Sequence, residues 1–482
     1  MKLQDLTALA RHLPEVEITG LTADSRAVGE GFLFAALEGT ATDGRLYIDD
    51  AVKNGAAAIL ARPGTEAPIP VVESENPRLT LAMLAMAFFR GQPRVIAGVT
   101  GTNGKTSVAR FAQQLWALLG CRSGSIGTLG AFASGYEYAL KHTTPDPVEL
   151  HQVLGGMNTV GTTHVAMEIS SHGLAQFRAD GVNLELAAFT NITRDHFDYH
   201  KDFEDYYAAK SRLFTELLPR GKTVIIAAEG PGADRAVADA EAAGRRAVTV
   251  GRHGKLLRLT ELHPAATGLH ITVEAEDRTY KLRLPMIGAF QAENALVAAG
   301  LVIESGYAPS LVLPKLEEIS AAPGRMQLAA VRKMRGGEAA VYVDYAHTPA
   351  AIETVLKAIR PHTAGRLHVV LGAGGDRDTA KRPEMGAAAA KLADHVVITD
   401  DNPRFEDPDI IRKQVAEGAP NADVTGDRHE AILTAVRGLQ PGDTLVIAGK
   451  GHERGQSING VTYPFDDVEV AQEAATSEGE AA

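Results

Sequence analysis

A glycine-rich segment, residues 98–107, carries the residue types that bind a triphosphate. It reads Gly-Val-Thr-Gly-Thr-Asn-Gly-Lys-Thr-Ser and lies between an apolar strand-like run and a helix-like run. Glycines let backbone N–H groups approach phosphates, Lys105 would add a positive charge, and Thr106 could ligate Mg²⁺. Gly98 lies one residue too far from Gly104 for the standard phosphate loop. The alternative is a glycine-rich turn before an ordinary helix, but the strand–loop–helix context favours a variant phosphate loop.

Two further residues could complete a metal site beside such a loop. Glu168 follows the apolar run 165–167, where a Mg²⁺-ligating carboxylate is expected, and His196 follows the strand-like run 187–190. Taken singly, Glu168 could be a buried hydrogen-bonded carboxylate and His196 a loop histidine. Together with the phosphate loop they indicate metal ligands. Lys210 lies on an amphipathic helix, where the pattern alone predicts an ordinary solvated lysine.

The last third of the chain places polar residues after four apolar strands. The strands are predicted at 340–343, 367–371, 395–398 and 444–447, and polar clusters follow at 344–347, 375–378, 400–404 and 450–453. In an open parallel sheet, ligands bind beyond the carboxyl ends of the strands, so the clusters predict one shared site. Arg377 and Arg404 would bind a carboxylate and Glu453 an ammonium, which together fit an amino acid. Salt bridges between strands are the alternative.

Polar loops elsewhere could hold an anionic substrate. Near the N-terminus, 24–26 and 39–45 supply hydroxyls and loop N–H groups for a diphosphate or a sugar, although this signal is weak. The loops 143–147 and 170–178 follow predicted strands of the central region, and Arg178 is a candidate for contact with another anionic group.

These sites require a large α/β protein. Apolar strand-like runs alternate with helical stretches along the 482 residues, which is typical of mostly parallel sheets. Breaks at 91–93 and 322–325 predict three domains: 1–92, a smaller N-terminal α/β domain; 93–323, with a central P-loop-type parallel sheet; and 324–482, with a C-terminal Rossmann-like parallel sheet. The acidic segment from Asp466 to the end of the chain is expected to fray.

Composition restricts the location and partners of the chain. The net charge of -12 argues against non-specific binding to nucleic acid or to anionic membranes. The single cysteine, Cys121, fits a reducing compartment, and no signal peptide or bilayer-spanning run is found. We expect a cytoplasmic protein without membrane insertion.

The motifs identify a resemblance to the Mur ligases, the ATP-dependent amide-bond-forming enzymes of peptidoglycan precursor synthesis. The resemblance runs from Asp-Ser-Arg at 24–26 to Gly-Lys-Gly-His-Glu at 449–453, so it covers almost the whole chain. The loop Thr-Gly-Thr-Asn-Gly-Lys-Thr at 100–106 is similar to the family's own phosphate loop, which explains its spacing. The segments 168–173, 191–200 and 324–326 are similarly specific.

The resemblance implies roles for individual residues. Lys105, Glu168, His196 and Lys210 would form the catalytic centre. Mg²⁺ would be held by Thr106, Glu168, His196 and Lys210, the lysine as a carbamate made with CO₂, which reverses the expectation from its pattern. ATP would contact Gly101, Thr102, Asn103, Gly104, Lys105, Thr106, Ser107, Asn294, Arg325, Asp344 and His347. UDP-MurNAc-L-Ala-D-Glu would contact Ala23, Ser25, Thr40, Ala41, Thr42, His142, Thr143, Thr144, Ser170, Gln176 and Arg178. Diaminopimelate would contact Arg377, Asp401, Asn402, Pro403, Arg404, Gly449 and Glu453.

The choice of amino acid follows from one motif. Members of the family that add diaminopimelate resemble this chain in carrying Asp-Asn-Pro-Arg, here 401–404, whereas lysine-adding relatives lack the arginine. The resemblance therefore implies a ligase that adds meso-diaminopimelate. Separately, we expect a monomer. Residues 40–42 and His142 depart from some relatives, which leaves the sugar and pyrophosphate contacts open. Two alternatives remain at this point: a folylpolyglutamate synthase-type ligase, and an ATP-gated binding or scaffold protein that has lost the chemistry.

Overall fold

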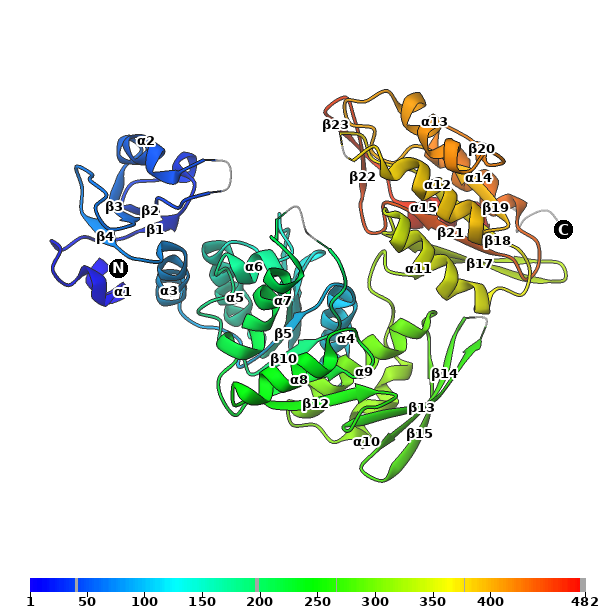
Figure 1. Ribbon diagram of the computed structural model, residues 1–482, viewed down its shortest axis with the longest axis horizontal. Coiled ribbons are helices and arrows are strands. Elements are labelled where there is room, and N and C mark those ends of the chain that lie inside the picture. The colour runs from blue at the N-terminus through cyan, green and yellow to red at the C-terminus, as the bar shows by residue number, and fades with distance from the viewer. Residues whose placement is uncertain (40–41, 196–198, 266, 377, 477–482) are drawn as a thin grey trace. The chain divides into compact units, whose positions relative to one another are not determined.

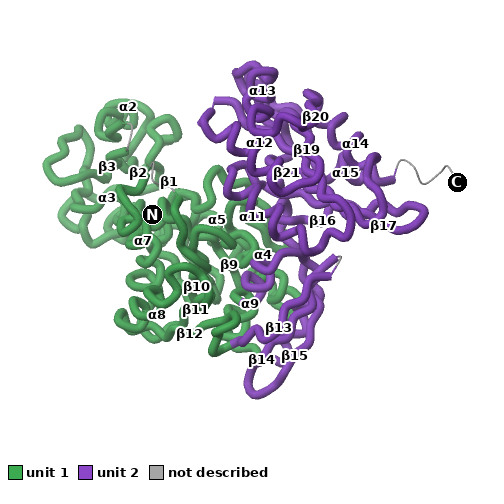
Figure 2. The backbone as a smooth tube through the Cα atoms, turned by 45° about the vertical axis from the view of Figure 1, so that its right-hand side comes forward, with its two compact units in different colours: residues 1–256, 297–308 green, residues 257–296, 309–482 purple. Residues whose placement is uncertain are grey.

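The computed structural model describes residues 1–39, 42–195, 199–265, 267–376 and 378–476 (Figure 1). Contacts between residues divide the chain into two compact units (Figure 2). Unit 1 comprises 1–256 with 297–308, and unit 2 comprises 257–296 with 309–482.

The N-terminal part of unit 1 is a small parallel sheet with helices. Its four strands lie in the order β1-β2-β3-β4, and all neighbouring pairs are parallel. Leu33, Leu60 and Val72 from the strands pack with Leu81 and Leu84 in one core. The elements are β1 (Gly20–Thr22), β2 (Phe32–Ala35), β3 (Ala56–Ala61), β4 (Val71–Glu73), α1 (Leu3–Leu6), α2 (Ile48–Lys53) and α3 (Pro77–Phe89).

The rest of unit 1 is built on eight strands in the order β12-β11-β10-β5-β9-β6-β7-β8. The strands from β12 to β6 pair in parallel, and β7 and β8 add antiparallel strands at the edge. Every residue of β5 and of β9 is buried, as expected for the interior of a sheet covered on both faces. Their bounds are β5 (Val95–Thr100), β6 (Ser123–Gly127), β7 (Gly130–Ala133), β8 (Tyr136–Tyr138), β9 (His164–Glu168), β10 (Leu186–Phe189), β11 (Thr223–Ala227) and β12 (Arg246–Gly251).

Helices that connect these strands begin where the sequence provides caps. Asp146 accepts hydrogen bonds from two backbone N–H groups at the start of α5, and Pro147 occupies its first turn. Asn76 and Pro77 begin α3 in the same way. The helices of this region are α4 (Lys105–Leu118), α5 (Pro147–Thr159), α6 (Ser171–Ala175), α7 (Phe203–Arg212), α8 (Ala233–Ala242) and α9 (Ala289–Glu304). Only the last eight residues of α9 belong to unit 1.

Unit 2 contains three antiparallel strands and a larger, mostly parallel sheet. The strands β13 (Leu257–Ala265), β14 (Gly268–Ala275) and β15 (Arg278–Leu284) pair antiparallel. The larger sheet has the order β16-β17-β21-β18-β19-β20, in which β16 alone is antiparallel. Its strands are β16 (Gln327–Met334), β17 (Gly337–Asp344), β18 (Leu367–Leu371), β19 (His395–Ile398), β20 (Asp423–Val424) and β21 (Thr444–Ala448).

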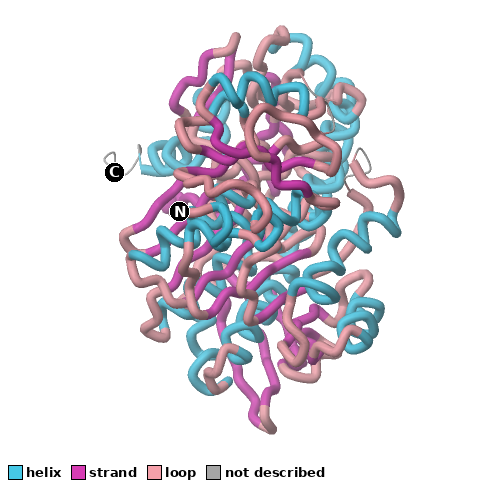
Figure 3. The backbone as a smooth tube through the Cα atoms, turned by 90° about the vertical axis from the view of Figure 1, so that its left-hand side faces the viewer, coloured by secondary structure: helices cyan, strands magenta, loops and turns pink. Residues whose placement is uncertain are grey.

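Alternate residues of this sheet face two separate cores. Figure 3 distinguishes the helices (cyan) from the strands (magenta) along the backbone. Val369 and Val446 pack on one face with residues of α11, α12 and α13, whereas Val370 and Leu445 pack on the other with residues of α14 and α15. The helices are α10 (Pro309–Val312), α11 (Pro349–Ile359), α12 (Lys381–Leu392), α13 (Pro408–Gly418), α14 (Arg428–Gly438) and α15 (Asp467–Thr476). A hairpin, β22 (Gly455–Ile458) with β23 (Val461–Pro464), follows the last strand of the sheet.

The predicted fold class is confirmed: the N-terminal, central and C-terminal regions each contain a parallel sheet in an α/β arrangement. The strands predicted at 367–371 and 395–398 have those bounds, and the one predicted at 340–343 extends over 337–344. The expectation of fraying from Asp466 is wrong for 467–476, which form α15, because Val470, Ala471 and Ala474 pack into a core. Within the described residues, no helix has the length and apolarity needed to cross a membrane.

Candidate active site

The glycine-rich loop joins buried β5 to the start of α4, as predicted. Gly101 has φ +147°, and a Cβ there would lie 1.9 Å from Thr190 Oγ1, so only glycine fits. Gly104 has φ +88° and directly precedes Lys105, the first residue of α4. Asn191 accepts a hydrogen bond from the Asn103 N–H through Oδ1 at 3.1 Å, so the end of β10 supports the loop. The loop therefore presents backbone N–H groups at a helix N-terminus, a geometry suited to phosphate.

Two lysine amines converge on this loop. Lys105 Nζ donates to the carbonyl oxygens of Gly101 and Thr102, at 2.9 and 2.8 Å, and Lys210 Nζ donates to the same Gly101 oxygen at 2.7 Å. The pattern-based expectation of a solvated Lys210 is wrong, because its residue is 1% exposed. Its helix, α7, buries the face that carries Tyr206 and Lys210, and the amine lies 4.6 Å from the centre of the Tyr206 ring.

Burial lowers the pKa of the Lys210 amine well below its usual range, and the neighbouring charge of Lys105 lowers it further. The charge of Asp195 acts in the opposite direction with a smaller effect. A lysine with a lowered pKa is neutral and nucleophilic over a wider pH range than a solvated one. Lys210 is therefore suited to chemistry on its nitrogen as well as to binding.

Glu168 ends β9 and contacts the loop, as its position in the sequence predicts. Its residue is 2% exposed, and Oε2 accepts a hydrogen bond from Thr106 Oγ1 at 2.8 Å. Oε1 accepts from the Thr128 backbone N–H at 2.9 Å. A buried carboxylate beside a threonine hydroxyl is a hard-oxygen donor set of the kind that Mg²⁺ binds, and the residues present fit that ion.

The third predicted metal ligand, His196, lies outside the described residues. Among those residues, no group of three or more His, Cys, Asp and Glu side chains could hold a metal ion. A metal bound at Thr106 and Glu168 would thus need further ligands from ATP, water, Lys210 or the 196–198 segment.

The predicted substrate loops form one hydrogen-bonded group in unit 1. Arg178 donates to the Thr144 carbonyl oxygen at 2.8 Å and to Gln176 Oε1 at 2.7 Å. Gln176 in turn donates to the Tyr199 hydroxyl at 3.1 Å. Thr144 Oγ1 accepts from the Ser170 backbone N–H at 2.9 Å. The structure therefore brings Thr144, Ser170, Gln176 and Arg178 together.

The other residues predicted to hold this substrate have separate contacts. Thr143 Oγ1 lies 3.0 Å from Thr128 Oγ1, next to the Glu168 contact, whereas His142 is exposed. In the N-terminal sheet region, Asn54 donates to the Ser25 carbonyl oxygen at 3.0 Å, and Thr42 Oγ1 lies 3.3 Å from the Tyr47 hydroxyl. Ala23 is exposed beside Ser25. Thr40 and Ala41 lie outside the described residues.

An aromatic and imidazole cluster next to Gln176 was missed by the sequence analysis. The His172 and Tyr199 rings lie 4.1 Å apart, and His172 and His200 lie 5.6 Å apart. His200 is 2% exposed and its Nδ1 lies 3.1 Å from Asp205 Oδ2. Its buried Nε2 has no hydrogen-bond partner among the described residues. A signal was present, because His172, Tyr199 and His200 lie within the family-specific segments 168–173 and 191–200.

In unit 2, the ends of β17 and of its neighbours carry the predicted polar clusters. Asp344 accepts from the backbone N–H groups of Met326 and Ala346, at 2.7 and 2.8 Å, and burial raises the pKa of its carboxyl group. Arg325 stacks over the Tyr345 ring with 4.7 Å between the guanidinium carbon and the ring centre. The Asp344 carboxylate thereby fixes the position of the 324–326 turn.

The other two predicted ATP contacts also lie in unit 2. His347 is exposed, and its Nδ1 lies 2.8 Å from the Tyr345 carbonyl oxygen. Asn294, on α9, is buried and donates to Gln291 Oε1 at 3.2 Å.

The described residues predicted to bind the amino acid follow the ends of β19 and β21. Arg404 donates from one guanidinium nitrogen to the Gly375 carbonyl oxygen at 2.5 Å and has φ +55°, an uncommon conformation for a residue with a side chain. Both of its backbone polar groups bind the β22–β23 hairpin: its N–H donates to Ser457 at 2.9 Å, and its carbonyl accepts from Asn459 at 2.6 Å. The hairpin thus holds the arginine turn. Arg377 lies outside the described residues.

Lys450 lies beside the residues predicted to bind the amino acid and was not assigned a role from the sequence. Lys450 is fully buried, and its amine contacts Asn402 and Glu453. Glu453, predicted to bind a ligand's ammonium, accepts from Asn402 Nδ2 at 2.8 Å. Gly449 has φ +117°, and a Cβ there would lie 2.4 Å from Asp401 Oδ2. The sequence signal was present, because Lys450 lies within the Gly-Lys-Gly-His-Glu cluster.

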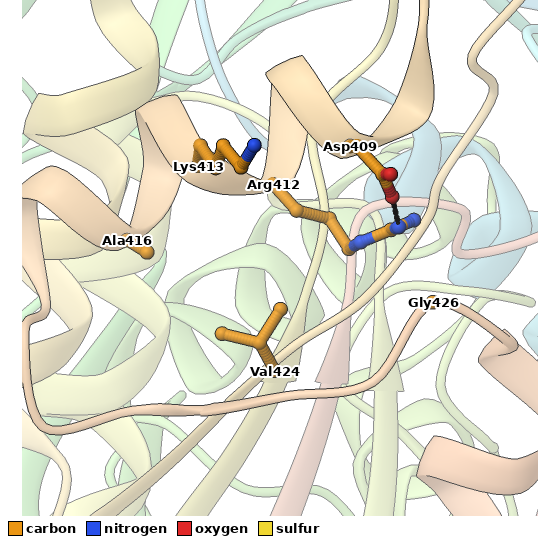
Figure 4. Close-up of a pocket in the computed structure, with 6 residues that line it drawn as sticks. All are labelled: Asp409, Arg412, Lys413, Ala416, Val424 and Gly426. Carbon is orange, nitrogen blue, oxygen red and sulfur yellow. Dashed lines mark hydrogen bonds and ion pairs between the residues drawn. The ribbon is translucent and has the colours of Figure 1, made fainter.

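A hollow of about 320 Å³ lies elsewhere in unit 2 (Figure 4). It is lined by Asp409, Arg412, Lys413, Ala416, Val424 and Gly426, none of which is a predicted site residue. Arg412 is held there by Asp409, as Figure 4 shows, and by Asp400. The guanidinium already has two carboxylate partners, so this hollow is not the candidate active site.

Comparisons with known proteins match three stretches of the chain to one family. Family models match at 17–88 (Mur ligase family, catalytic domain), 99–302 (Mur ligase middle domain) and 324–451 (Mur ligase, glutamate ligase domain). A protein of Brucella melitensis called UDP-N-acetylmuramoyl-L-alanyl-D-glutamate–2,6-diaminopimelate ligase is 48% identical over 98% of both chains. A protein of Caulobacter vibrioides with the same name is 50% identical over 94% of both chains.

Solved structures agree with the fold. A structure titled as a UDP-N-acetylmuramoyl-L-alanyl-D-glutamate–2,6-diaminopimelate ligase has a TM-score of 0.71 and 32% identity, and covers 95% of this chain and 94% of its own. Folylpolyglutamate synthase from Mycobacterium tuberculosis has a TM-score of 0.60 and 19% identity over 77% of this chain and 92% of its own, a likeness of fold alone.

Proposed function

This chain belongs to the Mur ligase family, and from that premise we propose that it is an ATP-dependent ligase of peptidoglycan precursor synthesis. Its substrates are UDP-N-acetylmuramoyl-L-alanyl-D-glutamate, meso-diaminopimelate and ATP. The observation that carries this proposal is the similarity, over nearly the full length, to several ligases named for that reaction. Residues 1–92 bind the uridine nucleotide, 93–323 bind ATP, and 324–482 bind the incoming amino acid.

The phosphate loop and the carboxylate beside it support the ATP assignment. Residues 101–107 bind the phosphates through backbone N–H groups, and Lys105 leaves the loop carbonyls to contact the β- and γ-phosphates. Thr106 and Glu168 would hold Mg²⁺ with His196, and bound Mg²⁺ supplies a positive charge that neutralises the transferring phosphate. The further contacts assigned to ATP are Asn294, Arg325, Asp344 and His347.

We assign Lys210 as the carbamylated lysine of the family. Its neutral amine, favoured by the lowered pKa, attacks CO₂, and the nitrogen then loses a proton to give a carbamate. The carbamate places an anion beside the Lys105 cation, so the two side chains attract each other. The carbamate would act as a further oxygen ligand for Mg²⁺.

The reaction consists of two transfers on the acceptor's D-glutamyl γ-carboxylate. A carboxylate oxygen attacks the γ-phosphorus of ATP, the bond to ADP breaks, and an acyl phosphate forms. The amine of diaminopimelate then attacks the acyl carbon, phosphate leaves, and the amine loses a proton as the amide forms. The protein's contribution is positioning and charge stabilisation, with Arg178, Gln176 and Thr144 holding the acceptor.

The turn at 401–404 supports diaminopimelate as the added amino acid. Diaminopimelate differs from lysine by a carboxylate on its distal carbon, and a guanidinium fork binds a carboxylate with two parallel hydrogen bonds. Arg404 and Arg377 bind that carboxylate, and Glu453 with Gly449 binds the ammonium. The hydrogen bond from Arg404 to Gly375 and the hairpin fix the orientation of the fork.

We further propose that the ligase acts in the cytoplasm as a monomer, without nucleic acid or membrane insertion. Its activated nucleotide substrates and its net charge of -12 support this. Its product would enter cell-wall synthesis, and with it cell shape and division.

One assay separates this function from its alternatives. ADP release is measured with ATP and Mg²⁺, with and without the muramoyl-dipeptide nucleotide and diaminopimelate. We expect release only with both substrates. Release supported by folate and glutamate would instead identify a folylpolyglutamate synthase-type ligase. ATP binding without release under any condition would identify a scaffold protein.

A further inference from the structure

Lys450 is a buried cation that the proposed reaction does not use. It follows Gly449 directly after β21, and its side chain is 0% exposed. A buried ammonium is stable only when several polar partners replace its water. Its Nζ donates to Asn402 Oδ1 at 2.9 Å, and lies 3.3 Å from Glu453 Oε2 and 3.8 Å from Asp401 Oδ1.

All three partners belong to the proposed amino-acid site. Asn402 Oδ1 accepts from Lys450 and from the Ser457 backbone N–H at 2.9 Å, so the amide nitrogen must point the other way. That nitrogen donates to Glu453 Oε2 at 2.8 Å. Lys450 thereby fixes the Glu453 carboxylate directly and through Asn402. The Glu453 side chain remains 35% exposed, so a ligand can still reach the carboxylate.

Other fully buried cations of unit 2 pair differently. Arg428 pairs with Asp467, with 2.7 Å between guanidinium nitrogen and carboxylate oxygen, and Arg382 pairs with Glu406 at 2.9 Å. Their carboxylate partners are not among the residues assigned to the amino acid. Of these three cations, Lys450 alone makes a direct side-chain contact with that set. Arg428 acts on Asp401 and Glu453 through its charge.

We propose that Lys450 is a positioning residue for the incoming amino acid. It holds the Glu453 carboxylate in the orientation that receives the ammonium of diaminopimelate, and it keeps the nearby Asp401 and Glu453 carboxylates from repelling each other. This inference rests on the proposed function of the site, and it adds a residue to which no role has been assigned.

Steady-state kinetics of two variants test the inference. Lys450→Met removes the charge but keeps the length of the side chain, and Lys450→Gln keeps some hydrogen bonding if the first variant fails to fold. We expect KM for diaminopimelate to rise about tenfold or more, because this corresponds to the loss of roughly one charge-assisted hydrogen bond. We expect kcat and KM for ATP to change less than about threefold, because the phosphate loop is untouched.

Arg428→Met is the matched control, since it also removes a fully buried cation from the same unit. It should lower Tm and change KM for diaminopimelate much less than Lys450→Met does, because the Arg428 charge acts on Asp401 and Glu453 without a direct contact. If the two methionine variants change KM equally, or if the Lys450 variants change only Tm, then Lys450 has a structural role alone and the inference fails.

A double-mutant cycle with Glu453→Gln tests whether Lys450 acts through Glu453. If it does, Lys450→Met adds less than about twofold to the KM of the Glu453→Gln protein. Independent, multiplying effects would contradict the inference. The unsubstituted protein distinguishes a failure of the proposed function from a failure of this inference. If it shows no diaminopimelate-dependent ADP release, the proposed function and this inference are both overturned. Normal release with an unchanged KM in the Lys450 variants overturns the inference alone.

Discussion

Gly127→Ala should displace the Glu168 carboxylate without altering any polar group. Gly127 is the last residue of β6, and a Cβ built there lies 2.0 Å from Glu168 Oε1 and 2.5 Å from its Cδ. Ordinary contact begins at 3.4 Å, so the carboxylate must move by about 1.4 Å. That movement breaks the 2.8 Å hydrogen bond from Thr106. Because Glu168 is buried, the side chain has little room to adjust.

The size of the effect follows from these distances. Overpacking a buried site costs about 1–3 kcal/mol, and the loss of a hydrogen bond to a charged group costs about 1.5–3 kcal/mol. We expect the free energy of unfolding to fall by about 2–4 kcal/mol, since the two losses partly share one relaxation. A displacement of about 1 Å at a reacting group lowers kcat about 100-fold. Urea unfolding and substrate-dependent ADP release measure the two quantities.

Gly124→Ala in the same strand is the control. A Cβ there lies 2.8 Å from the Phe132 carbonyl oxygen and 3.1 Å from the Ala133 Cβ, with no atom of Glu168 among its nearest neighbours. It should lower stability and leave kcat within about threefold, measured well below its Tm. If Gly127→Ala kept a kcat within the same range, the position of Glu168 would not matter for catalysis, and our assignment of the metal site would be refuted.

The other predictions concern Lys210, Arg404 and the metal. Lys210→Ala should lower kcat at least about 100-fold, with partial recovery on adding short carboxylic acids; normal activity would exclude the carbamate. In CO₂-free buffer the folded chain binds fewer protons at Lys210 than the unfolded chain does, so stability should rise as pH increases toward 10.5, a dependence that Lys210→Met should remove in unfolding curves. Arg404→Met should lower kcat/KM for diaminopimelate about 10- to 100-fold and leave KM for ATP unchanged; an equal rise in both KM values would argue for a folding defect. EDTA should abolish ADP release and Mg²⁺ restore it; persistent release in EDTA would contradict the metal assignment.

Local sequence patterns predicted the elements that carry the site. Apolar runs followed by polar clusters gave strands such as β18 with their observed bounds, because buried parallel strands must be continuously apolar. The contact between Glu168 and the phosphate loop could also be predicted, since β9 lies directly beside β5 in the parallel sheet.

Burial of charged groups could not be predicted in the same way. Lys210 lies on a helix whose pattern resembles a solvated face, and only the packing of α7 against the phosphate loop shows that its amine is enclosed. Lys450 was overlooked because a lysine between two glycines has no periodicity to reveal its environment. In both cases the decisive partners are distant in sequence: Gly101 for the first, Asn402 for the second.

The most direct test of the account is the amino-acid specificity of the purified protein. Phosphate release is measured with ATP, Mg²⁺ and the muramoyl-dipeptide nucleotide, while meso-diaminopimelate, LL-diaminopimelate, L-lysine and L-ornithine are supplied in turn. We expect rapid release with meso-diaminopimelate and little with lysine or ornithine, because neither has a distal carboxylate for Arg404. Release with lysine as fast as with the diacid would contradict the account.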